Sequence, residues 1–310
     1  MKFGACVWPF DWRPPYEDTV RRIAGLGFRA VELIAWDRDA LDEYYTPQRI
    51  RNLRKLLADE GVKLSEFVST PPGMSSPDPA AREQAVEHFK RLVEVGVELG
   101  TKLVNSVAPT PFAMPFPPIT EKHLRQEWTL DFGADRDWAQ NWVDYVDVMR
   151  RCCDLCEDAG VKYALEPHPY RLMRNAASMM RLLDHVGSPA LGMNFDPSHL
   201  FPMGEIPQMV IYEVGERVFH THFSDNDGTS NVHWRPGKGK IDWRGVLQAL
   251  QDVGYDNVIS IELEDVPGVS RPPVPGQAGQ PSTEALDREY LLAKEYLLGL
   301  CQELGILVEE

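Results

Sequence analysis

The chain has 310 residues, and its 32 lysines and arginines against 47 aspartates and glutamates give a formal net charge of −15. This acidic excess argues against nucleic acid as a partner, because phosphate backbones are bound by basic surfaces, and it disfavours an anionic membrane surface. Hydrophobic residues make up 43% of the chain and charged residues 25%, which excludes wholesale disorder and fits one large α/β barrel or two smaller domains.

The start of the chain and its cysteines indicate a compartment. Residues 1–8 lack the long apolar region of a secretory signal, and no apolar run is long enough to span a membrane, so a cytoplasmic location is expected. The five cysteines, an odd number, fit a reducing compartment better than a disulfide framework. Cys153 and Cys156 have redox or zinc spacing, but they lie in a helical pattern without a second cysteine pair. We therefore expect them to pack in the core.

Short β-branched runs alternate with longer amphipathic segments about eight times along the chain. The predicted strands cover residues 2–7, 28–34, 62–68, 102–107, 162–166, 190–195, 217–223 and 257–263. The predicted helices cover residues 17–26, 46–60, 80–99, 138–159, 175–186, 206–214, 242–253 and 284–304. This alternation predicts a single-domain, closed (β/α)₈ TIM barrel over residues 1–310. A doubly wound dinucleotide fold is disfavoured, because no Gly-x-Gly-x-x-Gly follows the first strand.

Two long segments interrupt the alternation, and both begin at the carboxyl ends of strands, where barrel active sites are built. Residues 109–137 follow the fourth strand and combine prolines with aromatic residues, so we expect a packed loop over a pocket. Residues 266–283 follow the eighth strand and are rich in proline and glycine. They form either a wall of the binding site or a disordered connector to the final helix, 284–304.

Four consecutive predicted strands end in an acid or a histidine, namely Glu166, Asp196, His222 and Glu262. Because barrel strands end at one common mouth, all four side chains can face the axis there. Three crowded carboxylates repel one another and need a compensating cation. Three carboxylates and one imidazole suit Mn²⁺, Mg²⁺, Co²⁺ or Zn²⁺. The alternative is that each acid only begins a loop or caps a helix.

The motifs around these residues carry a family resemblance. They are Leu165-Glu166-Pro167-His168, Phe195-Asp196-Pro197-Ser198-His199, His220-Thr221-His222-Phe223-Ser224-Asp225, Pro236-Gly237-Lys238-Gly239-Lys240-Ile241-Asp242-Trp243 and Ile259-Ser260-Ile261-Glu262-Leu263-Glu264-Asp265. In this order and spacing the sequence resembles the xylose-isomerase-like TIM-barrel superfamily of sugar and sugar-phosphate isomerases and epimerases. That group includes ketose 3-epimerases, hydroxypyruvate isomerase and inosose dehydratase, with endonuclease IV more distant.

The resemblance implies one divalent metal ion, with Mn²⁺ as the first choice and Mg²⁺, Co²⁺ or Zn²⁺ as alternatives. Its implied ligands are Glu166, Asp196, His222 and Glu262, and Glu166 and Glu262 would also form the acid/base pair. Alternation along a strand puts His220 on the same side as His222, so His220 is expected behind the ligands. Glu32, at the end of the second strand, is either a partner of the ligands or half of a structural ion pair.

Four further residues are candidates for contact with substrate. By resemblance, His199 matches a position that binds a substrate hydroxyl. His233 falls near the place where the epimerases carry a substrate-binding arginine, and this departure leaves the sugar open. Either His168 or His199 could protonate a leaving group. Trp8 either offers an aromatic face on which a sugar can stack or only packs in its loop.

The implied reaction is proton removal beside the carbonyl of a keto-sugar or keto-polyol, through an enediolate, which makes the protein a metal-dependent isomerase or epimerase. The same site could act as a lyase, either an inosose-type dehydratase or an enzyme that cleaves 3-keto-glycosides. An endonuclease IV-like phosphodiesterase and a non-catalytic sugar-binding barrel are the remaining alternatives, and the acidic charge argues against the first. The resemblance also implies a homo-oligomer.

Overall fold

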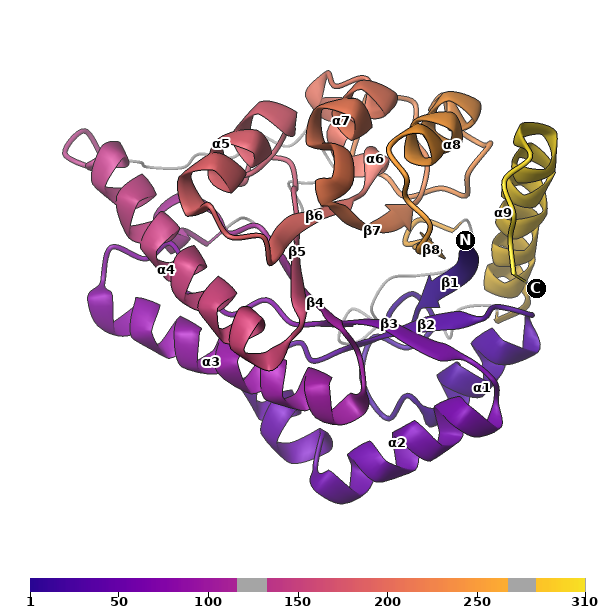
Figure 1. Cartoon of the computed structure of the whole chain (residues 1–310), viewed down its shortest axis with the longest axis horizontal. Coiled ribbons are helices and arrows are strands. Elements are labelled where there is room, and N and C mark those ends of the chain that lie inside the picture. Colours follow the sequence, from indigo (N-terminus) through magenta and orange to yellow (C-terminus); the bar gives the residue numbers. More distant parts are fainter. Residues whose placement is uncertain (116–132, 267–282, 310) are drawn as a thin grey trace, which may run out of the picture.

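The structure is a computed structural model that describes residues 1–115, 133–266 and 283–309. Eight parallel strands close into a barrel in chain order, which confirms the predicted fold class (Figure 1). The strands are β1 (Lys2–Cys6), β2 (Ala30–Ile34), β3 (Lys63–Val68), β4 (Leu103–Val107), β5 (Lys162–Glu166), β6 (Leu191–Phe195), β7 (Val218–Phe223) and β8 (Val258–Ile261). The barrel closes where β1 pairs with β8, with Phe3 opposite Ile259.

All but one of the described helices surround the barrel on the outside, the exception being the short α6 at its mouth (Figure 1). The helices are α1 (Glu17–Gly25), α2 (Pro47–Asp59), α3 (Pro79–Leu99), α4 (Trp138–Ala159), α5 (Ala176–Val186), α6 (Pro197–Leu200), α7 (Pro207–Val214), α8 (Trp243–Asp252) and α9 (Thr283–Leu304). Short 3-10 or π segments occur at η1 (Ala40–Tyr44), η2 (Pro111–Ala113), η3 (Phe201–Met203) and η4 (Gly215–Arg217). The eight predicted strands and eight predicted helices all occur, with ends within two residues of prediction; α6 was not predicted.

Local signals in the sequence explain where the helices begin and end. The side chains of Thr46 and Asp78 accept backbone N–H bonds at the start of α2 and α3, and a proline follows each of them. Gly100 and Gly160 follow α3 and α4 with φ of 95° and 64°, a left-handed conformation that favours glycine. These signals make each βα unit a well-defined block between successive strands.

The apolar core lies between the barrel and its helices, and the alternation of β7 shows how this positions the site. Phe223 points outward and packs against Trp243 of α8, with ring centroids 4.7 Å apart. His220 and His222 occupy the alternate positions and point into the barrel. Cys153 and Cys156 are buried and free in α4, which confirms their expected role in core packing.

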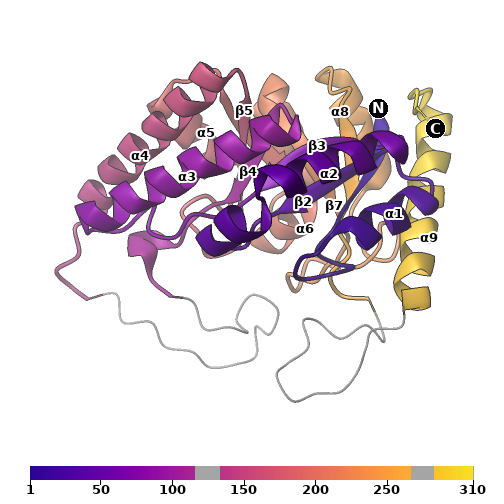
Figure 2. The same ribbon diagram turned by 90° about the horizontal axis from the view of Figure 1, so that it is seen from below.

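The two ends of the described chain lie side by side next to β1 (Figures 1 and 2). The backbone N–H of Glu309 donates to the carbonyl of Met1 at 2.9 Å, and the amino group of Met1 donates to the carbonyl of Leu307 at 2.8 Å. Lys2 and Glu309 form an ion pair of 2.5 Å. The segment after α9 therefore fastens the last helix to the first strand.

The two long segments predicted at the mouth are described only in part. Of 109–137, residues 116–132 lie outside the described residues, and of 266–283, residues 267–282 do. The start of the first segment is packed, because Phe112 is buried and its backbone N–H donates to Asn141 of α4 at 3.1 Å. Within the described ranges, none of the helices combines the length and apolarity needed to cross a membrane.

We expect His88 of α3 to make stability depend on pH. Burial, and then the positive charge of Arg38, lower its pKa from 6.5 to about 4, and its Nε2 lies 2.9 Å from Ser69 Oγ. The unfolded chain therefore binds more protons between these values, so the unfolding free energy falls as the pH drops through that window. From about pH 7.5 to about pH 5, wild type should lose about 1–2 kcal/mol more than His88→Gln in urea unfolding. Equal losses in the two proteins would contradict this prediction.

Candidate metal centre and active site

Side chains from four consecutive strands converge at the carboxyl-terminal mouth of the barrel. Glu166 ends β5, Asp196 follows β6, His222 lies in β7 and Glu262 follows β8. His222 Nδ1 lies 2.9 Å from Glu166 Oε1 and 3.3 Å from Glu262 Oε2. All four side chains are buried. The four residues predicted as metal ligands thus share one site, and two of the carboxylates face the same nitrogen of the imidazole.

Asp196 and Glu262 each have one oxygen fixed by the protein. Asp196 Oδ1 accepts the backbone N–H of Ser198 at 2.7 Å, as the cap of α6, and Glu262 Oε1 accepts the indole N–H of Trp8 at 2.6 Å. Neither Asp196 Oδ2 nor Glu262 Oε2 has a hydrogen-bond partner among the described residues. Buried acceptors of this kind are costly without a cation or donor, so both oxygens mark where such a group would bind.

Three histidines line the mouth beside these acids. The rings of His168 and His199 have centroids 3.5 Å apart, and those of His199 and His233 are 4.7 Å apart. His168 Nε2 lies 3.7 Å from Glu166 Oε2, and His199 Nε2 lies 3.5 Å from Asp196 Oδ2. All three predicted substrate-contact histidines are therefore at the site. Trp8 is there too, and its indole N–H binds Glu262.

The loop after β7 carries His233 to the mouth and is organised by buried Asp225. The carboxylate of Asp225 accepts backbone N–H bonds of 2.9 Å from Gly237 and 3.0 Å from Gly239. A Cβ on Gly239 would lie 2.2 Å from the Asn226 carbonyl oxygen, so this position requires glycine. The glycine–lysine motif thus serves loop geometry, which brings His233 Nδ1 to 3.9 Å from Asp196 and 3.8 Å from Glu264.

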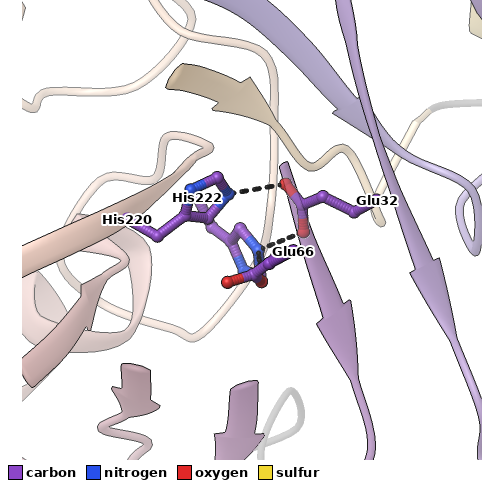
Figure 3. A group of neighbouring side chains, drawn as sticks. All are labelled: Glu32, Glu66, His220 and His222. Carbon is purple, nitrogen blue, oxygen red and sulfur yellow. Dashed lines mark hydrogen bonds and ion pairs between the residues drawn. The ribbon is translucent and has the colours of Figure 1, made fainter. Parts of the chain in front are cut away.

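A second group of acids and histidines lies deeper in the barrel (Figure 3). Glu32 of β2 reaches both histidines of β7: its Oε2 is 2.8 Å from His222 Nε2 and its Oε1 is 2.9 Å from His220 Nε2. Glu66 of β3 lies 3.2 Å from His222 Nε2 and accepts a bond of 3.0 Å from the amide of Asn105. His220 therefore contacts Glu32 behind the mouth, and Glu32 binds the imidazole of His222.

The buried acids are of two kinds, those whose pKa is lowered and those whose pKa is raised. Burial would raise the pKa of Glu32, but the charges of His222 and His220 and their hydrogen bonds hold it well below its usual range. Burial raises the pKa of Asp196 well above its usual range, and the charges of Glu262 and Glu166 add to the effect. Burial also raises the pKa of Glu66, to about 7. Two of these carboxyls thus resist ionisation where no added positive charge is present.

Together these residues form a buried cluster of acids and histidines that can hold a divalent cation. Within the described residues the cluster contains five buried carboxylates, and the histidine nitrogens face them from several sides. The donor set of carboxylate oxygens and one Nδ1 nitrogen suits a hard or borderline divalent ion. The donor set and the two unpartnered oxygens, Asp196 Oδ2 and Glu262 Oε2, both indicate a cation site at the mouth.

Sequence reasoning missed part of the deeper group. Glu66 was not predicted as a site residue, although it is a lone acid in the buried half of β3. Asn194 was also missed; its amide nitrogen lies 3.0 Å from His222 Nδ1. The available signal was the strand period, since a polar residue that faces the barrel axis must find a partner inside.

Fold and site together define a (β/α)₈ barrel with an acid–histidine cluster at its mouth. A family model described as "Xylose isomerase-like TIM barrel" matches residues 20–288, well over half of the chain. The chain belongs to the xylose isomerase-like TIM-barrel family, as the motifs predicted.

Sequence identity to individual relatives is low. The chain is 24% identical over 248 residues to the inosose isomerase of Bacillus velezensis, which covers 76% of this chain and 79% of that one. It is 30% identical over 138 residues to an uncharacterised protein of Methanocaldococcus jannaschii, and this match spans about half the length of that relative, 47%, and 40% of this chain.

Solved structures share the fold across nearly the whole chain. D-psicose 3-epimerase of Clostridium cellulolyticum H10 has a TM-score of 0.75 at 21% identity and covers 97% of this chain and 99% of its own. A probable 3-DHS dehydratase from Bacillus anthracis has a TM-score of 0.69 at 18% identity, with 93% and 97% covered.

We expect a divalent cation to stabilise the fold through this cluster. Adding Mn²⁺ to chelator-treated protein should raise the midpoint of thermal unfolding, because binding to the folded state alone adds about 2.7 kcal/mol at a hundredfold excess over Kd. Asp196→Asn should lose most of this rise, whereas Asp184→Asn, on the exposed face of α5, should keep it. A midpoint that does not respond to Mn²⁺ in wild type would contradict the metal centre.

Proposed function

We propose that this protein is a divalent-metal-dependent isomerase or epimerase of keto-sugars or keto-polyols, with Mn²⁺ as the first candidate ion. The observation that carries the proposal is the convergence of Glu166 and Glu262 on His222 Nδ1, beside the unpartnered oxygen of Asp196. Membership of the xylose isomerase-like family and similarity to an inosose isomerase support the class of reaction.

Under this proposal, Glu166 and Glu262 are the proton-transfer pair. They come from β5 and β8, with β6 and β7 between them, so each approaches a substrate at the mouth from a different side. One carboxylate removes the proton from the carbon beside the carbonyl, and the other returns a proton to the opposite face. A divalent cation bound here would supply Lewis-acid stabilisation of the negative charge that develops on the enediolate. Trp8 holds Glu262 in place by its indole N–H.

The charges of the mouth favour a neutral substrate. Glu166, Asp196 and Glu262 carry three negative charges when ionised, and Glu264 lies 3.8 Å from His233 at the rim. A single divalent cation leaves this group with a net negative charge, which repels a phosphate. His168, His199 and His233 offer imidazole nitrogens suited to substrate hydroxyls.

A lyase is the second candidate, and one observation favours it. His168 and His199 stack beside Glu166, with their Nε2 atoms 3.7 and 3.8 Å from its carboxylate oxygens. An imidazole so close to the proton-removing group can protonate a leaving oxygen on the neighbouring carbon. Elimination would make the enzyme a dehydratase or a 3-keto-glycoside-cleaving enzyme.

Neutralising either proton-transfer residue should abolish most of the activity. Glu166→Gln and Glu262→Gln keep side-chain size but cannot take up the proton, so kcat should fall about 10²–10⁴-fold. Glu98→Gln, exposed on α3, is the matched control and should retain wild-type kcat. In deuterated water, wild type should exchange the abstracted substrate proton with solvent. Full turnover by either active-site variant, or turnover without exchange, would contradict the assignment.

The products should separate the two candidate reactions. We expect a screen of keto-sugars, keto-polyols and 3-keto-glycosides with Mn²⁺ to yield a product of unchanged mass and altered stereochemistry or carbonyl position. Mass spectrometry and chiral chromatography measure both properties. Loss of one water, or release of an aglycone, would instead identify the lyase.

A further inference from the structure

The barrel interior beneath the mouth holds a group that the proton-transfer chemistry does not use. Glu32 is fully buried on β2, 190 residues away from His222 in sequence, and its carboxylate crosses the barrel interior to reach β7 (Figure 3). Its two oxygens have separate partners: Oε2 faces His222 Nε2 at 2.8 Å, and Oε1 faces His220 Nε2 at 2.9 Å. The hydroxyl of Ser260 also donates to Oε1.

Each ring nitrogen of His222 faces a carboxylate, one below the mouth and one at it. An ionised carboxylate only accepts hydrogen bonds, so the partner of Glu32 Oε2 is the Nε2–H of His222. The other nitrogen points the opposite way, toward Glu166 Oε1 at 2.9 Å and Glu262 Oε2 at 3.3 Å. The same rule makes Nδ1 a donor to Glu166 while no cation is bound. A cation held by Glu166 and Glu262 would take the place of that proton, whereas the Nε2–H would stay on Glu32.

We propose that Glu32 is a positioning residue that holds His222 as the Nε2–H tautomer and so presents the Nδ1 lone pair to the cation site at the mouth. This inference rests on the proposed metal-dependent function. His220 and Ser260 hold the Glu32 carboxylate in orientation, because both contact its Oε1 and leave Oε2 to His222. Hydrogen bonds of this kind fix the ring angle and strengthen an imidazole as a ligand.

Glu66 is the natural comparison, because it lies in the same layer and is equally buried. Its Oε1 is 3.2 Å from His222 Nε2, farther than Glu32, and already accepts the Asn105 amide. Removing Glu66 deletes a buried carboxyl but leaves the bond between Glu32 and His222. The pair Glu32→Ala and Glu66→Ala therefore separates orientation of His222 from loss of a buried acid.

The test measures Mn²⁺ binding to chelator-treated protein by calorimetry. Glu32→Ala should weaken Mn²⁺ binding about 10–100-fold, and Glu66→Ala by less than about threefold. Glu32→Gln keeps an oxygen that can accept the Nε2–H, so it should bind Mn²⁺ more tightly than Glu32→Ala. Wild-type affinity in Glu32→Ala would overturn this inference while leaving the metal centre intact. A wild type that binds no Mn²⁺ would overturn both.

A second readout does not depend on the stability of any variant. In wild-type protein loaded with diamagnetic Zn²⁺, ¹⁵N NMR of labelled histidines should show His222 protonated at Nε2 and bound through Nδ1. Zn²⁺-loaded Glu32→Gln should show a share of His222 rings bound through Nε2, with a circular dichroism spectrum like that of wild type. Coordination through Nε2 in wild type would overturn the role of Glu32, even if Glu32→Ala failed to fold.

Discussion

The site depends on one imidazole ring that is held from both sides. His222 has Glu32 at Nε2 and Glu166 and Glu262 at Nδ1, so it joins the deep layer of the barrel to the mouth. The ring reaches both groups because β7 places its side chain inside the barrel, near the carboxyl end of the strand. The register of β7 with β8, in which His222 lies opposite Ser260, sets the position of His222 along the barrel axis.

Several buried carboxylates at this place oppose stability. A barrel interior is usually filled by layers of branched apolar side chains, which need no partners. Here Glu32, Glu66, His220 and His222 replace part of that filling, and each buried charge must be hydrogen-bonded or neutralised. Below the mouth, mutual pairing offsets part of this cost, although Glu66 Oε2 and His220 Nδ1 have no hydrogen-bond partner among the described residues. At the mouth, one oxygen of Asp196 and one of Glu262 have no hydrogen-bond partner among the described residues. This is where a ligand would bind.

Much of this arrangement could be predicted from the sequence, because the physics involved is local or periodic. Glycines after helices and the alternation of apolar runs predicted all eight strands and their order. The acids at strand ends then predicted that Glu166, Asp196 and Glu262 would meet. Which oxygen of each acid the protein itself binds could not be predicted, because the indole of Trp8 and the backbone of Ser198 reach the acids only in the folded chain.

The deeper layer escaped prediction for a related reason. A single acid such as Glu66 within a strand has the same local pattern whether it faces solvent at an edge or the axis of a closed barrel. A register shift between β2 and β3, at Val31 and Leu33, also disturbs the period in the region of Glu32 and Glu66. Closure and this irregularity are properties of the whole sheet. They make Glu32 and Glu66 neighbours of a histidine more than 150 residues away, and they place Glu32 where it supports His222 from below the mouth.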